Sequence, residues 1–474
     1  MRFKKVFFVN LPYEAGRYSK PLNPPASLGY LAEYISSKGL EYDVLDMSFG
    51  YSFDDFKKRI KSFKPDLIGF SVFSFQYLKA YEFIKRVKTS FPDISLIAGG
   101  PHPSLLKEKI LTECPFLDYA VAGDGEETLY ELMSGKDIPL ISGLAYRKDK
   151  DVLWNGVRDF NQNLDIYPFP KYQKFELKKY LEKRIPVITS RGCPFSCIYC
   201  SAPKICGKRV RFRSPLNILE EIQYWYDKGY RTFPVMDDNF IIIKKRAKET
   251  CQLISERKLK DCSFLCPNGI RADCVDEEIL SAMKKAGFKE LSYGVEVGND
   301  KMLKIIKKNE RISDIDKAVK LSCEMGFRVT LFFIIGFPEE TFEDFMDCVN
   351  FALKYPVMTV KFFNLIPYPQ TELFDYINSK GLFRVSPEDY LNKPDYFTTV
   401  PVFDSPGMSF EEKIKAIKIG RETEIKVVRK FLLFRFKNNK FIQFFIKIAP
   451  LKFILNLYWE NPFFRRIFGM IRYR

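Results

Sequence analysis

Three cysteines lie close together in the stretch RGCPFSCIYC, residues 191–200. Cys193, Cys197 and Cys200 follow one another at spacings of four and three residues. Thiolates on so short a segment can bind a metal centre, and cubane iron–sulfur clusters are held by thiolates of this kind. Three thiolates bind three of the four irons and leave the last iron open. The stretch therefore predicts an iron–sulfur cluster with one free coordination position.

A structural zinc site is the alternative for these cysteines. Zinc in such sites takes four ligands, and Cys206 is the nearest candidate for the fourth, because the chain has a single histidine, His102. Three unrelated core cysteines are a further interpretation, which the loop residues Gly192, Pro194 and Ser196 oppose. The scarcity of histidine also argues against catalytic triads and dyads. The cluster remains the favoured interpretation.

Composition predicts a folded protein of two or three domains. The chain has 474 residues, 46% hydrophobic and 16% aromatic. No apolar leader follows Met1, so the eleven cysteines are expected to be reduced and the protein cytoplasmic. The formal charge is +17, but residues 425–474 alone hold twelve Lys or Arg against Glu460. The rest of the chain is close to balanced, which argues against nucleic acid as a partner.

Residues 1–135 alternate between strand and helix patterns. The expected strands are 5–10, 42–46, 66–72, 94–100 and 119–123. Short apolar strands separated by helices predict a parallel, doubly wound (Rossmann-like) sheet. Ligands of such sheets bind at the carboxyl ends of the strands. From these residues alone, a receiver-like or nucleotide-binding domain is equally compatible.

The cysteines come directly after the first strand of a second alternating region, residues 185–400. Its expected strands are 185–190, 232–238, 263–269, 290–296, 328–336 and 359–367. Six such units predict a partial (β/α)6, TIM-like barrel with its site at the carboxyl-terminal rim. Residues 136–184, with a hairpin pattern and a Pro- and Tyr-rich run, are expected to form a linker. Residues 401–474 are expected to be a basic, aromatic-rich helical region.

The cysteine spacing resembles the CxxxCxxC motif of the radical S-adenosylmethionine (SAM) superfamily, and the resemblance extends from residue 185 to about residue 390. In that family the open iron chelates the amino and carboxylate groups of SAM. Further motifs of the family recur in order: MDDNF (236–240), NGIRAD (268–273), YGVEVG (293–298), FIIGFPEE (333–340) and PYPQTELF (367–374).

This resemblance implies SAM-binding roles for Tyr199, Asp237, Asp238, Arg271, Glu296, Ile334 and Gly336. The chain departs from the family pattern at Val297, where a serine is frequent, and at Gln370, where the turn has glycine. Plainer interpretations stand beside these roles: the two aspartates cap a helix, and Glu296 pairs with a lysine. Cys262 and Cys266 are expected to be core thiols rather than ligands of a second cluster.

The first region, including NPPASLGYLAEYI at 23–35, resembles the cobalamin-binding domain. The residues expected to bind cobalamin are Asn10, Ser71, Gly99, Gly100, His102 and Gly123. In that family the serine and the two adjacent glycines make room for the nucleotide tail. The family's Asp-x-His, which supplies the lower cobalt ligand, is replaced here by Asn10-Leu11-Pro12. His102 is expected to be a satisfied loop residue or to contact the corrin periphery.

Together the two resemblances imply a cobalamin-dependent radical SAM enzyme of the methyltransferase class. In that class SAM is cleaved reductively at a [4Fe–4S] cluster, a 5′-deoxyadenosyl radical forms, and methylcobalamin methylates an unactivated carbon. Related enzymes close rings, oxidise or contract rings, so a cyclase or oxidoreductase is the alternative. A non-enzymatic cobalamin sensor and a radical enzyme with a vestigial first domain are the other interpretations.

The resemblance also implies a small-molecule or lipid-like substrate and a reducing partner such as flavodoxin or ferredoxin. The basic tail has no uncharged run long enough to span a membrane. Within 438–449, Lys440, Gln443 and Lys447 form a polar stripe on an otherwise apolar helix. Such a helix is expected either to cap the barrel or to bind the inner face of an anionic membrane peripherally.

Overall fold

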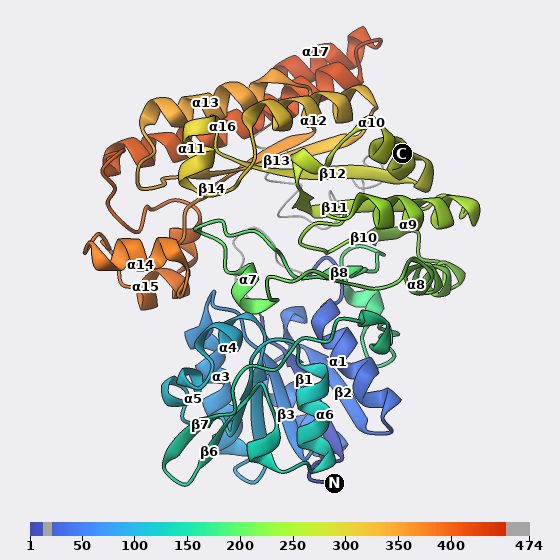
Figure 1. The fold of residues 1–474 in the computed structure, drawn as a ribbon, viewed down its shortest axis with the longest axis vertical. Helices are drawn as coiled ribbons and strands as arrows, with labels where there is room; N and C mark the ends of the chain where they lie inside the picture. Colours follow the sequence, from blue (N-terminus) through green and yellow to red (C-terminus); the bar gives the residue numbers. More distant parts are fainter. Residues whose placement is uncertain (13–20, 452–474) are drawn as a thin grey trace.

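The computed structural model describes residues 1–12 and 21–451 and consists of two α/β halves (Figure 1). The first half contains a seven-stranded sheet with the order β2-β1-β3-β4-β5-β6-β7. Its strands are β1 (Lys5–Asn10), β2 (Glu41–Asp46), β3 (Leu67–Ser71), β4 (Ser95–Gly99), β5 (Tyr119–Val121), β6 (Leu144–Lys148) and β7 (Asp151–Trp154). The first five are parallel, which confirms the predicted doubly wound sheet.

Helices cover both faces of this sheet, which explains its continuous apolar strands. Val6 and Phe8 of β1 belong to one core cluster, and Phe7 and Val9 belong to the other. Two helices pack on the first face, α1 (Ala26–Ser37) and α6 (Glu126–Ser134). Three pack on the second face, α2 (Phe53–Phe63), α3 (Tyr77–Ser90) and α5 (Lys109–Glu113). The short helix α4 (Pro101–Leu106) follows β4.

The predicted hairpin after residue 136 forms as β6 and β7, but it does not stand apart in a linker. β6 pairs antiparallel with β5, with Tyr146 opposite Tyr119, so the hairpin extends the first sheet. The pairing satisfies the edge of β5, which would otherwise expose its backbone N–H and C=O groups. The domain boundaries drawn from composition remain a prediction.

The second half contains a parallel sheet with the order β10-β11-β12-β13-β14. These strands are β10 (Thr232–Pro234), β11 (Ser263–Ile270), β12 (Phe288–Glu296), β13 (Arg328–Ile335) and β14 (Thr359–Asn364). The predicted strand 185–190 lies beside β10, where Ile185 and Val187 donate backbone hydrogen bonds to Thr232 and Pro234 at 3.1 and 2.9 Å. It forms isolated bridges and then turns into β8 (Ser190–Arg191), which pairs antiparallel with β9 (Arg211–Phe212).

Helices pack around the outside of this open barrel (Figure 1). They are α8 (Pro215–Asp227), α9 (Lys244–Glu256), α10 (Glu277–Ala286), α11 (Asp300–Ile305), α12 (Ile312–Glu324) and α13 (Phe342–Lys354). The remaining helices are α7 (Ala202–Ile205), α14 (Glu372–Ser379), α15 (Pro387–Asn392), α16 (Phe410–Arg435) and α17 (Lys440–Ile448). The architecture therefore confirms the predicted fold class: a parallel sheet, a partial barrel and a helical C-terminal region.

The long helix α16 covers the end of the barrel sheet beside β14. Ala416 and Ile417 pack with Ile335 of β13 and Phe345 of α13 in one cluster. The cap expected from the sequence concerned residues 438–449, which form α17, whereas this packing belongs to the preceding helix α16. Residues 452–474 of the predicted helical region lie outside the described residues. Among residues 1–12 and 21–451, no helix is long and apolar enough to cross a membrane.

Close packing at Gly420 leads to a prediction about this cap. A Cβ atom at Gly420 would lie 2.9 Å from Phe362 of β14, so Gly420→Val should overpack the contact and destabilise the fold by about 1–3 kcal/mol. Lys418→Val on the exposed face of α16 is the matched control and should change stability by roughly 0.5 kcal/mol or less. Thermal unfolding followed by circular dichroism measures both, and equal midpoints for the two variants would contradict this packing.

Candidate cofactor site between the two sheets

The carboxyl-terminal edges of the two sheets face each other. Arg191, at the end of the first barrel strand, lies 3.2 Å from the carboxylate of Asp124, which follows β5. Gln370, beyond β14, donates a hydrogen bond to the carbonyl of Leu105, which follows β4. Because ligands bind at this edge in both kinds of sheet, the loops predicted to bind cobalamin and those predicted to bind SAM meet in one region.

The cysteine loop is anchored through its backbone, and its three cysteines form no disulfide. The N–H of Ile198 donates to Ile306 at 3.1 Å, and the carbonyl of Ile198 accepts from Leu373 at 3.0 Å. Cys193 donates its N–H to Gly207 at 3.1 Å. Gly192 has φ of +104°, and a Cβ there would lie 2.5 Å from the carbonyl of Arg209, so only glycine fits.

The three thiols are near neighbours and partly buried. Burial raises the pKa of Cys193, Cys197 and Cys200, that of Cys200 to about 12, and neighbouring thiols raise the pKa values of Cys193 and Cys200 further. Lys308 and Arg271 act in the opposite direction on the pKa of Cys197. Thiols that are neutral on their own and next to cations are suited to deprotonation by a bound metal.

The zinc alternative needs a fourth ligand, for which Cys206 is the nearest candidate. Among residues 1–12 and 21–451, no group of three or more His, Cys, Asp or Glu side chains is placed to hold a single metal ion. Cys206 remains a partly exposed free thiol, so the zinc alternative gains no support. Cys262 and Cys266 are buried, as expected of core thiols.

The two aspartates of MDDNF have different environments. Asp237, 3% exposed, accepts hydrogen bonds from the backbone N–H of Thr189 at 2.6 Å and from the hydroxyls of Thr189 and Ser190. Its carboxylate is thus engaged in holding the first barrel strand, and the predicted SAM contact gains no support from it. Asp238 is exposed beside the cysteines, and its pKa is raised by desolvation and by Asp237.

The helix-cap interpretation of these aspartates is wrong, because α9 begins only at Lys244 with Ile243 at its N-cap position. The next residue of the motif, Asn239, offers a polar side chain to a ligand. Asn239 is 6% exposed, and among the described residues its amide has no hydrogen-bond partner other than the thiol of Cys274. A buried amide without further partners is costly, so a polar ligand at this rim would stabilise it.

Glu296 forms the ion pair that the plainer interpretation expects. Its carboxylate lies 3.2 Å from the Nζ of Lys308, which is 7% exposed and also lies 3.5 Å from Glu310. The phenol of Tyr199 belongs to the same group, because its pKa is raised by burial and by the Glu296 carboxylate. Glu296 has φ of 67°, a left-handed conformation that is rare for a residue with a side chain and recurs at binding sites.

Arg271 supports the cysteine loop directly. Its guanidinium lies 3.6 Å from the ring centroid of Phe195, which stands between two of the cysteines. It also donates to the carbonyl of Lys308 at 2.8 Å and pairs with Asp273 at 2.8 Å. These contacts hold a positive charge next to the thiols.

The loop after β13 meets Tyr199. Ile334 lies near the end of the strand, and Gly336 has φ of +101°. The N–H groups of Gly336 and Phe337 donate to the carboxylate of Glu340 at 2.6 and 3.1 Å. The ring of Phe337 packs edge-on against Tyr199, with centroids 5.6 Å apart. The two rings present aromatic surface beside this loop, which suits contact with a flat heterocycle.

Gln370, which replaces the glycine of the PyPGTxL turn, keeps the backbone conformation of a glycine. Its φ is 64°, in the left-handed region that glycine adopts readily. A left-handed non-glycine residue costs on the order of 1–2 kcal/mol. The side chain offsets part of this cost through its hydrogen bond to Leu105 of the first half.

The residues predicted to bind cobalamin lie at one edge of the first sheet, with the exception of the buried His102. Asn10 ends β1 and donates to Asp46 at 3.0 Å, and Ser71 and Gly99 end the adjacent strands β3 and β4. A Cβ at Gly99 would meet nothing within 4 Å, so open space lies above this edge, as a bulky ligand requires. Gly100 and Gly123 have φ of +108° and +83°, conformations that favour glycine.

His102 is 3% exposed and belongs to the satisfied-loop interpretation. Its Nε2 lies 2.9 Å from the hydroxyl of Tyr81 and its Nδ1 lies 3.2 Å from that of Ser74. Its ring stacks on Tyr77. Burial lowers the pKa of the imidazole to about 3, so it stays neutral. Both nitrogens have protein partners, so a corrin contact gains no support.

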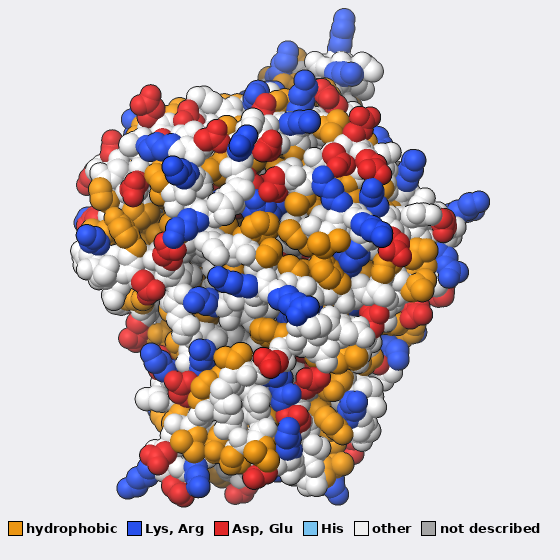
Figure 2. Space-filling view, viewed as in Figure 1, with side chains coloured by type: hydrophobic (Ala, Val, Ile, Leu, Met, Phe, Trp, Pro, Cys, Tyr) orange, Lys and Arg blue, Asp and Glu red, His pale blue; other side chains and the backbone are white. Residues whose placement is uncertain are grey.

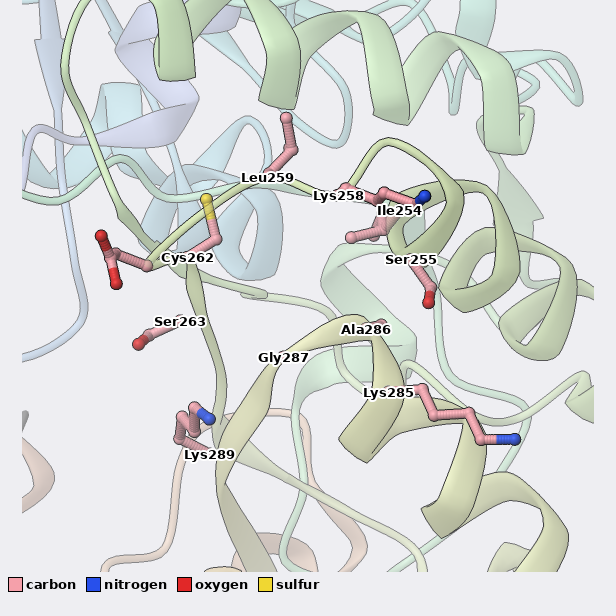
Figure 3. Close-up of a pocket in the computed structure, with 11 residues that line it drawn as sticks. Ile254, Ser255, Lys258, Leu259, Cys262, Ser263, Lys285, Ala286, Gly287 and Lys289 are labelled. Atoms are coloured by element: carbon pink, nitrogen blue, oxygen red, sulfur yellow. The ribbon is translucent and has the colours of Figure 1, made fainter.

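Two surface cavities have no cysteine of the loop in their lining. One, of about 400 Å³, is bordered by Lys258, Lys285 and Lys289 near the amino-terminal ends of β11 and β12 (Figure 3). The other, of about 530 Å³, lies beside Asp273 and Arg311. The amino-terminal end of a barrel serves stability rather than chemistry, so the first cavity is no part of this site.

The fold and the cysteine loop together define a radical SAM enzyme with a second ligand-binding sheet. The model of the radical SAM superfamily matches residues 187–352, and that of the B12 binding domain matches residues 17–133. An uncharacterised methyltransferase of Pyrococcus horikoshii is 31% identical over 431 residues, which cover 88% of this chain and 92% of the relative. The chain belongs to the family of cobalamin-dependent radical SAM enzymes, whose cofactors are a [4Fe–4S] cluster, SAM and cobalamin.

Two further comparisons extend this result. An anaerobic magnesium-protoporphyrin IX monomethyl ester cyclase of Rubrivivax gelatinosus is 27% identical, covering 79% of this chain and 70% of the relative. The structure of the radical SAM methyltransferase TsrM of Kitasatospora setae, with cobalamin and a [4Fe–4S] cluster bound, superposes with a TM-score of 0.74. That match covers 88% of this chain and 90% of TsrM at 19% identity, and it confirms the fold.

Sequence reasoning missed Lys308, Asn239 and Arg191. Lys308 is one of two adjacent lysines in a polar run, and nothing in the run distinguishes a buried lysine from an exposed one. Asn239 lies within a motif that was recognised for its aspartates. Arg191 adjoins the cysteine loop, but its partners lie more than sixty residues away in the chain.

Glu340 leads to a prediction about pH. It is fully buried and burial raises the pKa of its carboxyl to about 7, above its usual value, so the folded state holds this proton more tightly than the unfolded chain. The stability that the proton contributes is complete below about pH 4.5 and is lost as the pH rises through about 7. Glu340→Gln should therefore gain thermal stability relative to the wild type over this interval.

Thermal midpoints measured from pH 4.5 to 7.5 test this expectation. Glu339→Gln, at the exposed neighbouring position, is the control and should follow the wild-type profile. A constant difference between Glu340→Gln and wild type at every pH would show that Glu340 does not titrate as described.

Proposed function

We propose that this protein methylates an unactivated carbon of a small organic substrate, with Cys193, Cys197 and Cys200 as the ligands of its cluster. The observation that supports this most is the opposition of the two carboxyl edges, joined by Arg191 and Asp124 3.2 Å apart. When bound, the cluster, SAM and cobalamin supply a carbon radical and a transferable methyl group. The chain supplies the positions of these groups and a dry space between them.

Named side chains account for SAM binding in this proposal. The ion pair of Glu296 with Lys308 would orient the polar groups of the ribose and methionine. Asp238, exposed beside the cysteines, and the amide of Asn239 would receive the methionine amine and carboxylate. Tyr199, Ile334 and Gly336 would enclose the adenine. Asp237 and Arg271 would act indirectly, because Asp237 holds the first barrel strand and Arg271 holds the cysteine loop.

Ring formation or oxidation is the second candidate reaction. It is favoured by the similarity to the Rubrivivax gelatinosus cyclase, which is 27% identical. Both candidates use the same cofactors and differ in the substrate. The non-enzymatic sensor interpretation is not retained, because the chain belongs to an enzyme family. A flavodoxin- or ferredoxin-like reductant is proposed as the electron donor, since the cluster must be reduced by one electron in each cycle.

The cysteine ligands can be tested by metal analysis. Anaerobically reconstituted wild type should hold about four irons per chain and cleave SAM reductively. Changing Cys193, Cys197 and Cys200 together to alanine should remove the cluster absorbance and the bound iron, because no thiolate remains on the loop. Cys206→Ala, a change of the same kind six residues beyond Cys200, should keep both. Iron retained in the triple variant would overturn the assignment.

We further propose that the protein is cytoplasmic and binds an anionic membrane through α17. Phe441, Phe444, Phe445 and Ile448 are 73, 60, 49 and 61% exposed on this short helix. Lys and Arg side chains gather at the same tip of the molecule (Figure 2). Aromatic residues and basic residues on one exposed helix match the chemistry of an interfacial anchor. A lipid-like substrate would be consistent with this surface.

Sedimentation with liposomes tests the membrane contact. Wild type should pellet with anionic vesicles at low salt and stay in solution with neutral ones, because the basic residues need an anionic surface. Changing Phe441, Phe444 and Phe445 to serine should abolish pelleting. Serine at Leu140, Val157 and Leu216, which are 64, 66 and 61% exposed elsewhere, is the matched control and should not. Wild type that remains in the supernatant with anionic vesicles would contradict the proposed membrane contact.

A further inference from the structure

One cluster of contacts joins the loop predicted to bind cobalamin to the cysteine loop. Arg191 immediately precedes Gly192 and Cys193, and its side chain is 14% exposed. One guanidinium nitrogen lies 3.2 Å from the carboxylate of Asp124, and another donates to Glu126 at 2.7 Å. Both acidic residues follow β5, next to Gly123. An arginine that pairs with two carboxylates fixes orientation as well as distance.

A second arginine strengthens the same link. Arg211 of β9 is fully buried, pairs with Asp124 as well, and donates to the carbonyl of Cys206 at 2.9 Å. Its guanidinium lies 4.3 Å from the ring centroid of Phe160. Asp124 is therefore held by arginines from both strands that flank the cysteine loop.

Phe160 fills the space between the two loops. A Cβ at Gly123 would lie 3.0 Å from its ring, and a Cβ at Gly207 would lie 2.8 Å from it. Gly207 in turn accepts the backbone hydrogen bond of Cys193 at 3.1 Å. The ring thus packs directly against one glycine of each loop. A displacement of either loop must move the ring or break the arginine pairs, because packed interiors transmit small shifts.

We infer that Arg191, with Asp124 and Glu126, is a positioning residue that couples the two cofactor sites thermodynamically. The inference rests on the proposed function, since it assumes that cobalamin binds above Gly99 and Gly123 and that the cluster binds at the cysteine loop. SAM bound at the cluster would then change the affinity for cobalamin, and cobalamin would change the affinity for SAM by the same factor. Contact alone does not establish coupling, so the test must measure it.

The experiment is a titration of the cluster-reconstituted full chain with hydroxocobalamin, with and without saturating SAM. The ratio of the two dissociation constants is the coupling factor, and in wild type it should be roughly 5-fold or more. Glu126→Gln and Asp124→Asn preserve shape and remove one charge each, and Arg191→Met removes the shared partner. All three variants should bring the ratio of the dissociation constants towards one. The double variant Arg191→Met/Glu126→Gln should have nearly the same ratio as either single variant, because both changes break the same ion pair.

Arg158→Met is the matched control. The side chain of Arg158 is 16% exposed. It pairs with Glu127 and Glu131, which lie on α6 as Glu126 does, and it makes neither of these pairs with the cysteine loop. It should lose thermal stability and keep the wild-type coupling factor, which separates coupling from loss of stability. Should Arg191→Met fail to fold, the two shape-preserving variants carry the test.

The outcomes are distinct. A wild type that binds no hydroxocobalamin would overturn the proposed function, and with it this inference. A wild type that binds hydroxocobalamin with a ratio of one would overturn the inference alone. A wild-type ratio kept in Glu126→Gln and Asp124→Asn would overturn the role of Arg191 and its partners. Loss of the ratio in these variants but not in Arg158→Met supports it.

Discussion

The site depends on a loop that must be rigid while its three thiols stay out of disulfides. The backbone meets this constraint. Cys193 and Ile198 make backbone hydrogen bonds to neighbouring segments, and Gly192 allows a turn that no other residue could make. Side chains from neighbouring strands then surround the loop. Arg271 lies on Phe195, and Lys308 brings a second cation near Cys197. The thiols are thus held ready for a metal centre whose negative charge the cations offset.

Buried carboxylates hold loops of the barrel in place as well. Asp237 uses its carboxylate to hold Thr189 and Ser190 at the end of the first strand, directly before the cysteine loop. Glu340 holds the loop after β13 through two backbone N–H groups. In both cases a buried carboxylate satisfies backbone or hydroxyl donors that would otherwise be costly inside the protein. The acidic residues at the rim therefore shape loops, and Asp238, which accepts a hydrogen bond from the backbone N–H of Gly192, is also exposed beside the cysteines.

The opposition of the two sheets gives the architecture its function. Each sheet alone offers an open edge to water, and each would bind its ligand on an exposed surface. In this structure the two edges face each other and are joined by contacts of Arg191, Asp124, Phe160 and Gln370. Radical chemistry gains from this opposition, because oxygen would trap a carbon radical and an unconfined radical would take hydrogen from the wrong group. The membership of the chain in the cobalamin-dependent radical SAM enzymes agrees with this geometry.

The sequence by itself determined the strands, the parallel sheets and the cysteine loop, because buried strands, turn glycines and ligand spacing are local patterns. It also determined that Cys262 and Cys266 are core thiols. Only the tertiary structure decided that Asp237 holds a strand, that His102 is enclosed by Tyr81 and Ser74, and that Gln370 keeps a glycine-like turn. It alone revealed Lys308 beside Glu296 and Arg191 beside Asp124. These outcomes depend on contacts with residues distant in the chain. A local sequence pattern does not show which distant residue makes the contact.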